Sequence, residues 1–162
     1  MKYIFMFFTF LSVCTTSDLL KIPLTLDVTR TINIPSGVTT IDVPFKIDPS
    51  QDADFQQYLS KIKDYEVDSI TIAPESWSGA AGTTFTGTLN FVDLGFSSTF
   101  PTMNLISYTY LPLSLKDANL LSMASDLSKY GKMNVNLNGT FNNNTGGTFN
   151  LKVKVHLKIK VV

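Results

Sequence analysis

Apolar and polar residues alternate along most of this chain, with the period of two that is typical of half-buried β-strands. The first such stretch runs from Leu24 to Ile34 and is interrupted by Pro35-Ser36-Gly37. A second runs from Ile41 to Ile47 and contains Pro44. Because proline cannot donate to a β-ladder, this second stretch is predicted to be an edge strand.

Helical spacing replaces the alternation in two places. Residues 48–50 read Asp-Pro-Ser, which is typical of a helix start, and Phe55, Leu59 and Ile62 follow on one helical face. This pattern predicts about twelve helical residues. A second helix is expected over residues 115–130, preceded by a variant capping box that starts at Ser114 and followed by Gly131 as a left-handed cap.

Three strands are expected between these two helices. They cover residues 65–72, 83–96 and 103–111. The parity of the apolar positions changes between Val67 and Ile70, which predicts a β-bulge. The parity changes again near the end of the second strand, which predicts either a bulge or a fully buried end.

The clearest alternation lies at the end of the chain. Residues 133–141 and 149–161 each place their apolar side chains on one parity, and an Asn/Thr/Gly-rich segment separates them. They are predicted to form a long antiparallel hairpin with one apolar and one polar face. About seven strands with two short inserted helices favour one antiparallel β-sandwich domain over residues 19–162, and a curved sheet backed by helices is the alternative.

The first residues have a different character from the rest. Lys2 is followed by an apolar run over residues 3–13, and residues 15–18 are polar. This is typical of an export signal, and the run is shorter than the roughly 20 apolar residues that a transmembrane helix needs. Residues 1–14 are therefore predicted to be a signal peptide.

Cys14 closes the apolar run. Leu11-Ser12-Val13-Cys14 resembles the bacterial lipobox, in which the cysteine is diacylated and becomes the first residue of the mature protein. Val13 departs from that pattern, since Gly, Ala or Ser usually precedes the cysteine. The resemblance implies that Cys14 carries two acyl chains, which together supply stable membrane attachment. The alternative is cleavage between Cys14 and Ser17, which would release a secreted protein.

Charge and composition narrow the function classes. The 162 residues include 13 Lys and Arg, 13 Asp and Glu, one Cys and one His. A net charge of zero argues against a general nucleic-acid binder, and a lone cysteine excludes a disulfide framework or a multi-cysteine zinc site. His156 lies between lysines on the polar parity of the last strand and is interpreted as a bystander. No catalytic residue, metal site or cofactor is predicted, and the chain is not expected to be an enzyme.

Two features are candidates for ligand contact. Four lysines share the polar face of the last strand: Lys152, Lys154, Lys158 and Lys160. They could meet an anionic lipid, glycan or acidic protein, or simply keep the strand soluble and discourage edge pairing. Trp77 lies in a Ser/Gly/Ala-rich loop, where it could stack on a sugar or cover the end of the sandwich.

The whole pattern resembles small cell-envelope lipoproteins of Bacteroidota. The resemblance is carried by the signal ending in Cys14, by Ile34-Pro35, by Tyr58-Leu59-x-x-Ile62, by Val67-x-Ser69-Ile70 and by the closing Lys/Val strand. It implies a β-sandwich exported to the outer membrane, on its periplasmic or surface face. The expected function is that of a lipid-anchored structural or adaptor protein with an envelope protein or glycan as partner, and a glycan- or lipid-binding module is the alternative.

Overall fold

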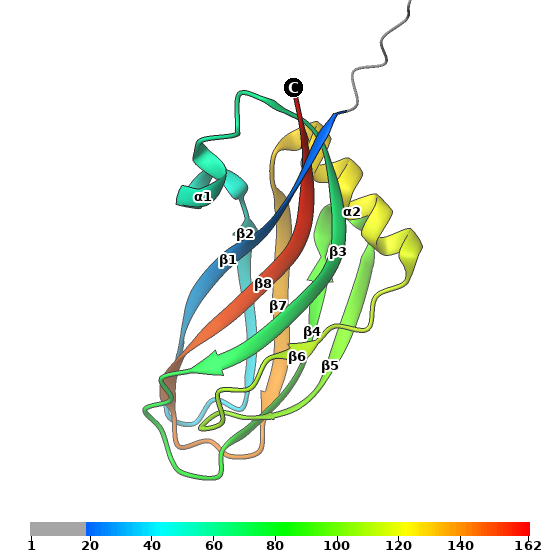
Figure 1. The fold of residues 1–162 in the computed structure, drawn as a ribbon. Helices are drawn as coiled ribbons and strands as arrows, with labels where there is room; N and C mark the ends of the chain where they lie inside the picture. Colours follow the sequence, from blue (N-terminus) through cyan, green and yellow to red (C-terminus); the bar gives the residue numbers. More distant parts are fainter. Residues whose placement is uncertain (1–18) are drawn as a thin grey trace, which may run out of the picture.

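The predicted β-sandwich is confirmed. The computed structural model describes residues 19–162, so the predicted signal peptide and Cys14 lie outside the described residues. Two four-stranded antiparallel sheets face each other, and their eight strands run along the long direction of the molecule (Figure 1). The number of strands is one more than expected from the alternation.

The strand order defines the topology. One sheet, called here the β8 sheet, has the order β1 (Leu20–Ile34), β8 (Gly147–Val161), β3 (Ile62–Glu75) and β6 (Leu111–Pro112). The other, the β7 sheet, has the order β2 (Thr40–Ile47), β7 (Met133–Phe141), β4 (Thr84–Phe91) and β5 (Phe96–Asn104). The first strand pairs with the last, the second with the seventh, the third with the sixth and the fourth with the fifth. This nested pairing is that of a jelly roll.

The two ends of the sandwich differ. The helix end carries the 3-10 turns η1 (Pro49–Gln51) and η2 (Val92–Leu94) and the helices α1 (Ala53–Gln56) and α2 (Asp117–Tyr130), as well as the start of β1 and the end of β8 (Figure 1). The loop end consists of the connections after β1, β3, β5 and β7, which cover residues 35–39, 76–83, 105–110 and 142–146.

The core lies between the sheets, and β8 is its central strand. Every second side chain of β8, from Phe149 to Val161, is buried, as its alternation predicts. Near the loop end, Phe85 stacks on Phe141 at a centroid distance of 4.7 Å and lies 6.0 Å from Phe149. Gly139 makes room for this cluster, since a Cβ there would overlap the Phe85 ring.

Several local predictions are confirmed. β2, which contains Pro44, is an edge strand. The register between β3 and β8 shifts between Val67 and Ser69, where the bulge was expected. Gly131 ends α2 with a φ of 70°, in the left-handed region where glycine is favoured.

The first predicted helix is largely wrong. Only residues 53–56 form α1, and the chain then turns so that β3 begins at Ile62, opposite Val161 of β8. Phe55 is fully buried whereas Leu59 is exposed, so the expected apolar stripe does not continue. Pairing with the central strand therefore outweighs the helical spacing of residues 55–62.

The start of the second helix also differs from the prediction. α2 begins at Asp117 rather than after Ser114. The Oδ1 atom of Asn119 accepts a hydrogen bond from the backbone N–H of Lys116 at 3.1 Å, and this contact holds the first turn. The helix start thus lies two residues later than expected, and its cap is one-sided because the Lys116 side chain has no atom that could accept a hydrogen bond.

The strands expected over 83–96 and 103–111 are not continuous. The first ends at Phe91, and η2 together with Gly95, at φ 67°, turns the chain into β5. The second ends at Asn104, whose Oδ1 accepts from the backbone N–H of Ile106 at 3.1 Å. This side-chain turn competes with the ladder, and only Leu111–Pro112 return to the sheet as β6.

The predicted terminal hairpin is wrong. β7 and β8 follow one another in the chain but belong to opposite sheets, and residues 142–146 cross between them. Both strands bury one parity, as predicted, but from opposite sides of the core. Alternation reports which residues face inward and not which sheet they face from.

Candidate functional site

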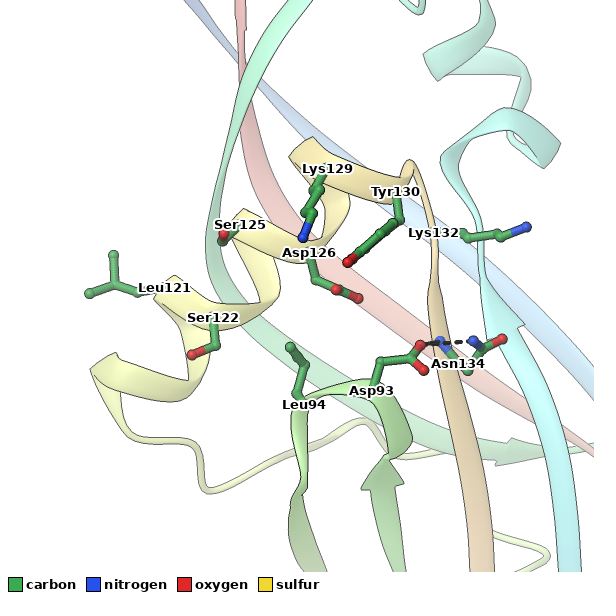
Figure 2. Close-up of a pocket in the computed structure, with 10 residues that line it drawn as sticks. All are labelled: Asp93, Leu94, Leu121, Ser122, Ser125, Asp126, Lys129, Tyr130, Lys132 and Asn134. Atoms are coloured by element: carbon green, nitrogen blue, oxygen red, sulfur yellow. Dashed lines mark hydrogen bonds between the residues drawn. The ribbon is translucent and has the colours of Figure 1, made fainter.

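An open groove of 830 Å³ runs along α2 at the helix end (Figure 2). Its walls come from α2, η2 and the start of β7, and we call it the α2 groove. The lining residues are Asp93, Leu94, Leu121, Ser122, Ser125, Asp126, Lys129, Tyr130, Lys132 and Asn134.

α2 is held in place by one apolar face. Met123, Ala124 and Leu127 are buried and pack into the core, and the helix contacts mainly β3. The opposite face is exposed, and it carries Leu121, whose exposed fraction is 72%. A leucine at this position contributes little to the core.

Asp126 is the one acidic residue buried among residues 19–162. It is only 7% exposed, and its Oδ2 atom has no hydrogen-bond partner within the described residues. Burial raises the pKa of this carboxyl above its ordinary value, the negative charge of Asp93 raises it further, and Lys129 opposes the shift. A buried carboxylate oxygen without a donor is costly, which makes Asp126 a candidate for ligand contact.

Two of the other polar groups in the groove, Asp93 and Lys129, have partners within the protein. The Oδ2 atom of Asp93 accepts from the Nδ2 atom of Asn134 at 2.8 Å and from its backbone N–H at 3.3 Å. The Nζ atom of Lys129 lies 4.8 Å from the centre of the Tyr130 ring. Figure 2 shows the side chains of Asp126 and Tyr130 directed toward the space between α2 and η2, with Leu121 directed away.

The sequence contains a signal for Asp126, although it belongs to no motif. Asp126 follows Met123 by three residues and precedes Leu127, so it falls inside the apolar stripe of the predicted helix. An acidic residue on the inner face of an amphipathic helix is unusual, because a buried charge needs a partner. The chemistry that the groove offers is polar contact by two carboxylates, three hydroxyls, one amide and two ammonium groups beside apolar Leu94 and Leu121.

A second open groove of 580 Å³ lies on the other side of α2, against β3. Its apolar wall includes Tyr65, Val67, Leu120 and Ala124. At its rim, Asp64 pairs with Lys160 at 2.6 Å, and this hydrogen bond is the main reason why the pKa of Asp64 is lowered. α2 is therefore flanked by grooves on both sides.

The four candidate lysines of β8 lie on the outer face of the β8 sheet, and each has a carboxylate partner on a neighbouring strand. Lys152 pairs with Glu75, Lys154 with Asp27, Lys158 with Glu66 and Asp68, and Lys160 with Asp64, at distances of 2.6 to 3.7 Å. β8 lies between β1 and β3, so these lysines do not protect a sheet edge. The face is a ladder of ion pairs rather than a purely basic surface.

Trp77 lies at the loop end and is half-buried. Its Nε1–H donates to the carbonyl of Ala80 at 2.9 Å, and its ring makes an edge contact with Phe149 at 6.3 Å. The backbone of Gly147 runs beneath the indole so closely that a Cβ there would lie 2.5 Å from the ring. The indole thus covers the end of the aromatic cluster.

His156 lies on the outer face of β8, where its Nδ1 atom is 3.2 Å from the hydroxyl of Thr25 on β1. Neither it nor Trp77 lines the α2 groove, and of the lysine ladder only Lys160 reaches the second groove.

Among residues 19–162 there is no group of three or more His, Cys, Asp or Glu residues that could hold a metal ion. In the same part of the chain, no helix combines the length and the apolar character needed to cross a bilayer.

Comparison with known proteins yields similarity at the level of solved structures alone. No family model matches the chain, and no curated protein sequence matches it. One similar chain comes from desmodium yellow mottle tymovirus, with a TM-score of 0.36 and 10% identity, and the match covers 99% of this chain and 96% of that chain. Another comes from turnip yellow mosaic virus, with a TM-score of 0.34 and 9% identity, and the match covers 85% of this chain and 94% of that chain. The BFDV capsid protein, solved as a 60-mer, has a TM-score of 0.42 and 8% identity, and the match covers 90% of this chain and 96% of that chain. The jelly-roll assignment rests on the strand order described above.

Proposed function

We propose that this chain is a lipid-anchored, non-enzymatic protein of the cell envelope with a structural or adaptor role. The observation that carries the proposal is the short apolar run that ends in Leu11-Ser12-Val13-Cys14. Acylation at Cys14 would tether the folded domain to a membrane, with the outer membrane as the proposed location.

The fold is consistent with a tethered structural module. The inner faces of both sheets are used for the core, and Trp77 packs against that core. β1, which follows the proposed anchor, pairs with β8 over its whole length from Leu20 to Ile34. A pull on the anchor would therefore act along a strand that is hydrogen-bonded throughout.

Metabolic labelling with a fatty-acid analogue tests the anchor. The full chain is expressed in a bacterium that acylates lipoproteins, next to the variants Cys14→Ala and Val13→Ala. Wild type should incorporate label and Cys14→Ala should not, whereas Val13→Ala should label at least as well as wild type because alanine suits the lipobox. Equal labelling of wild type and Cys14→Ala would overturn the proposal.

A binding module for glycan or lipid is the second candidate, and the α2 groove is the observation that favours it. Asp126 presents a buried oxygen without a partner, and Tyr130 lies beside it in the same groove. The test is an NMR titration of the acylated protein in micelles with N-acetylglucosamine oligomers. Shifts confined to α2 and η2 that vanish in Asp126→Asn would support this candidate, and unchanged spectra at saturating oligomer would exclude a glycan of this class.

A further inference from the structure

We infer that the helix end of the sandwich is its membrane-facing surface, and that this surface contacts the headgroup layer of the bilayer that holds the anchor. The inference rests on the proposed acylation of Cys14 and adds an orientation and a set of contact residues to it. Three observations carry it: the point where the tether enters the domain, the distribution of exposed apolar side chains, and the distribution of unpaired lysines.

The tether enters at the helix end and is short. Leu20, the first residue of β1, pairs with Val161 at that end and follows Cys14 by six positions. Six extended residues span at most about 20 Å. β8 has 15 residues and is therefore about 50 Å long. An anchor at Cys14 thus keeps the helix end within about 20 Å of the bilayer, whereas the loop end can lie much farther away.

Exposed apolar side chains gather at the same end. Of the nine large apolar or aromatic side chains that are exposed among residues 19–162, seven lie at the helix end: Leu19, Leu20, Leu59, Val92, Leu121, Tyr130 and Val162. The other two, Ile106 and Tyr108, lie at the loop end, where the hydroxyl of Tyr108 bonds to that of Tyr110. Aliphatic and aromatic side chains of this kind insert favourably at the boundary between headgroups and acyl chains.

The lysines separate in the same way. Lys21 and the four lysines of β8 are paired with carboxylates, whereas six others in residues 19–162 have no carboxylate within 4.0 Å. Five of these six, Lys46, Lys61, Lys63, Lys129 and Lys132, lie at the helix end, and the sixth, Lys116, directly precedes α2. Lysines at a bilayer surface can extend their ammonium groups toward phosphates while their methylene chains cover apolar surface.

Acidic groups at this end offset the charge of the lysines. Asp48 and Asp52 accept backbone N–H groups at the starts of η1 and α1, Asp93 accepts from Asn134, and Asp126 is buried. Asp54 and Asp117 remain exposed. A carboxylate that accepts a neutral N–H group keeps its negative charge, so the helix end carries similar numbers of lysines and carboxylates outside ion pairs. The lysines therefore contribute to membrane contact through individual ammonium–phosphate contacts and not through a net positive charge.

Quenching of tryptophan fluorescence by brominated phospholipids tests the orientation. Leu121→Trp places a reporter on α2, and Ile106→Trp is the matched control at the loop end. Both positions are highly exposed, at 72% and 60%, so neither change disturbs the core. Native Trp77 at the loop end serves as an internal reference in all three proteins. The acylated full chains are reconstituted into vesicles of phosphatidylethanolamine and phosphatidylglycerol, with and without bromine near the headgroup.

The expected result is strong quenching of the added tryptophan in Leu121→Trp and little quenching in Ile106→Trp or in wild type. Equal quenching of both variants, or quenching of Ile106→Trp alone, would overturn the orientation. Vesicle flotation in the same samples reports the anchor separately. If Leu121→Trp floats but its added tryptophan is not quenched, the membrane-facing surface is refuted but the anchor is not, and dimers in such a sample would identify a second copy as the occupant. A protein that fails to float refutes the proposed anchor itself.

Discussion

The helix end and the loop end of this sandwich differ in how their side chains are paired and buried. At the loop end, polar side chains close the turns, as where Asn143 donates to Thr83 at 2.7 Å, and the Trp77 indole covers the aromatic cluster. At the helix end, Leu121 and Tyr130 are exposed and Asp126 is buried without a partner. From this contrast we infer that the loop end contributes stability, whereas the helix end retains groups that a partner would satisfy.

The substitution with the largest expected effect on stability disrupts the packing near the loop end. In Gly139→Ala, the new methyl would overlap the Phe85 ring and lie 2.6 Å from the carbonyl oxygen of Thr86. Overpacking of this kind should lower the free energy of unfolding by about 3 kcal/mol, measured by urea denaturation. Gly131→Ala is the control at the helix end, where nothing lies within 4 Å and the strain of φ 70° alone should cost about 1 kcal/mol. Equal losses would contradict the contrast between the ends.

Removal of the indole is expected to have the next largest effect. Trp77→Ala loses the contact with Phe149 and exposes the aromatic cluster, which should lower the free energy of unfolding by about 2 kcal/mol. Leu121→Ala should change it by less than about 0.5 kcal/mol, because this side chain is already exposed in the folded protein. Calorimetric unfolding of both variants checks the pair, and a greater loss in Leu121→Ala would show that α2 depends on that side chain.

Asp126→Asn should raise the free energy of unfolding, unlike the substitutions above, and the size of this gain should depend on pH. Because burial raises the pKa of Asp126 in the folded protein, ionisation opposes folding, and the stability of wild type falls as pH rises above the ordinary pKa of 3.8. The asparagine variant should be more stable by about 1 kcal/mol at pH 7 and should show no gain at pH 3, where the carboxyl is protonated in both states. Urea denaturation at the two pH values checks this, and a loss at pH 7 would mean that the carboxylate has a partner.

The smallest expected effect concerns the ion pairs on the β8 sheet. In Lys160→Gln, Asp64 loses the hydrogen bond that chiefly lowers its pKa, so the pKa of Asp64 should rise toward its ordinary value. An NMR titration of the side-chain carboxyl carbons measures this shift directly. The stability that this pair supplies should be present above the ordinary pKa of Asp64 and be lost as the pH falls through its lowered value. An unchanged pKa would show that Ser128 and the Tyr65 N–H maintain the shift.

The sequence predicts the inward face of most strands well, because successive side chains of a strand point to opposite faces and the apolar ones are buried. The seven buried positions of β8 and the edge position of Pro44 were both predictable on this basis. The partner of each strand was not, since β7 and β8 have the pattern of a hairpin but lie in opposite sheets. Local spacing also failed at residues 48–62, where pairing of Ile62 with Val161 draws the chain into β3.

The candidate site was less predictable than the fold. The lysine ladder was visible in the sequence, but its partners Asp27, Asp64 and Glu75 come from other strands, and only the strand register brings them together. The α2 groove depends on the position of η2 beside α2, which no local pattern encodes. Asp126 was detectable as a charge within an apolar stripe, and the predicted helix around it was largely correct.

Neutron reflectometry of the acylated protein on a supported bilayer tests the central claim most directly. If the helix end faces the membrane, the strands stand away from the surface, and the protein layer should be about 50 Å thick, the length of β8. A sandwich lying on one sheet would give a layer of about 20 Å, from two sheets roughly 10 Å apart and their outer side chains. The first result is the one that the account predicts, and a layer of about 20 Å, or none at all, would contradict it.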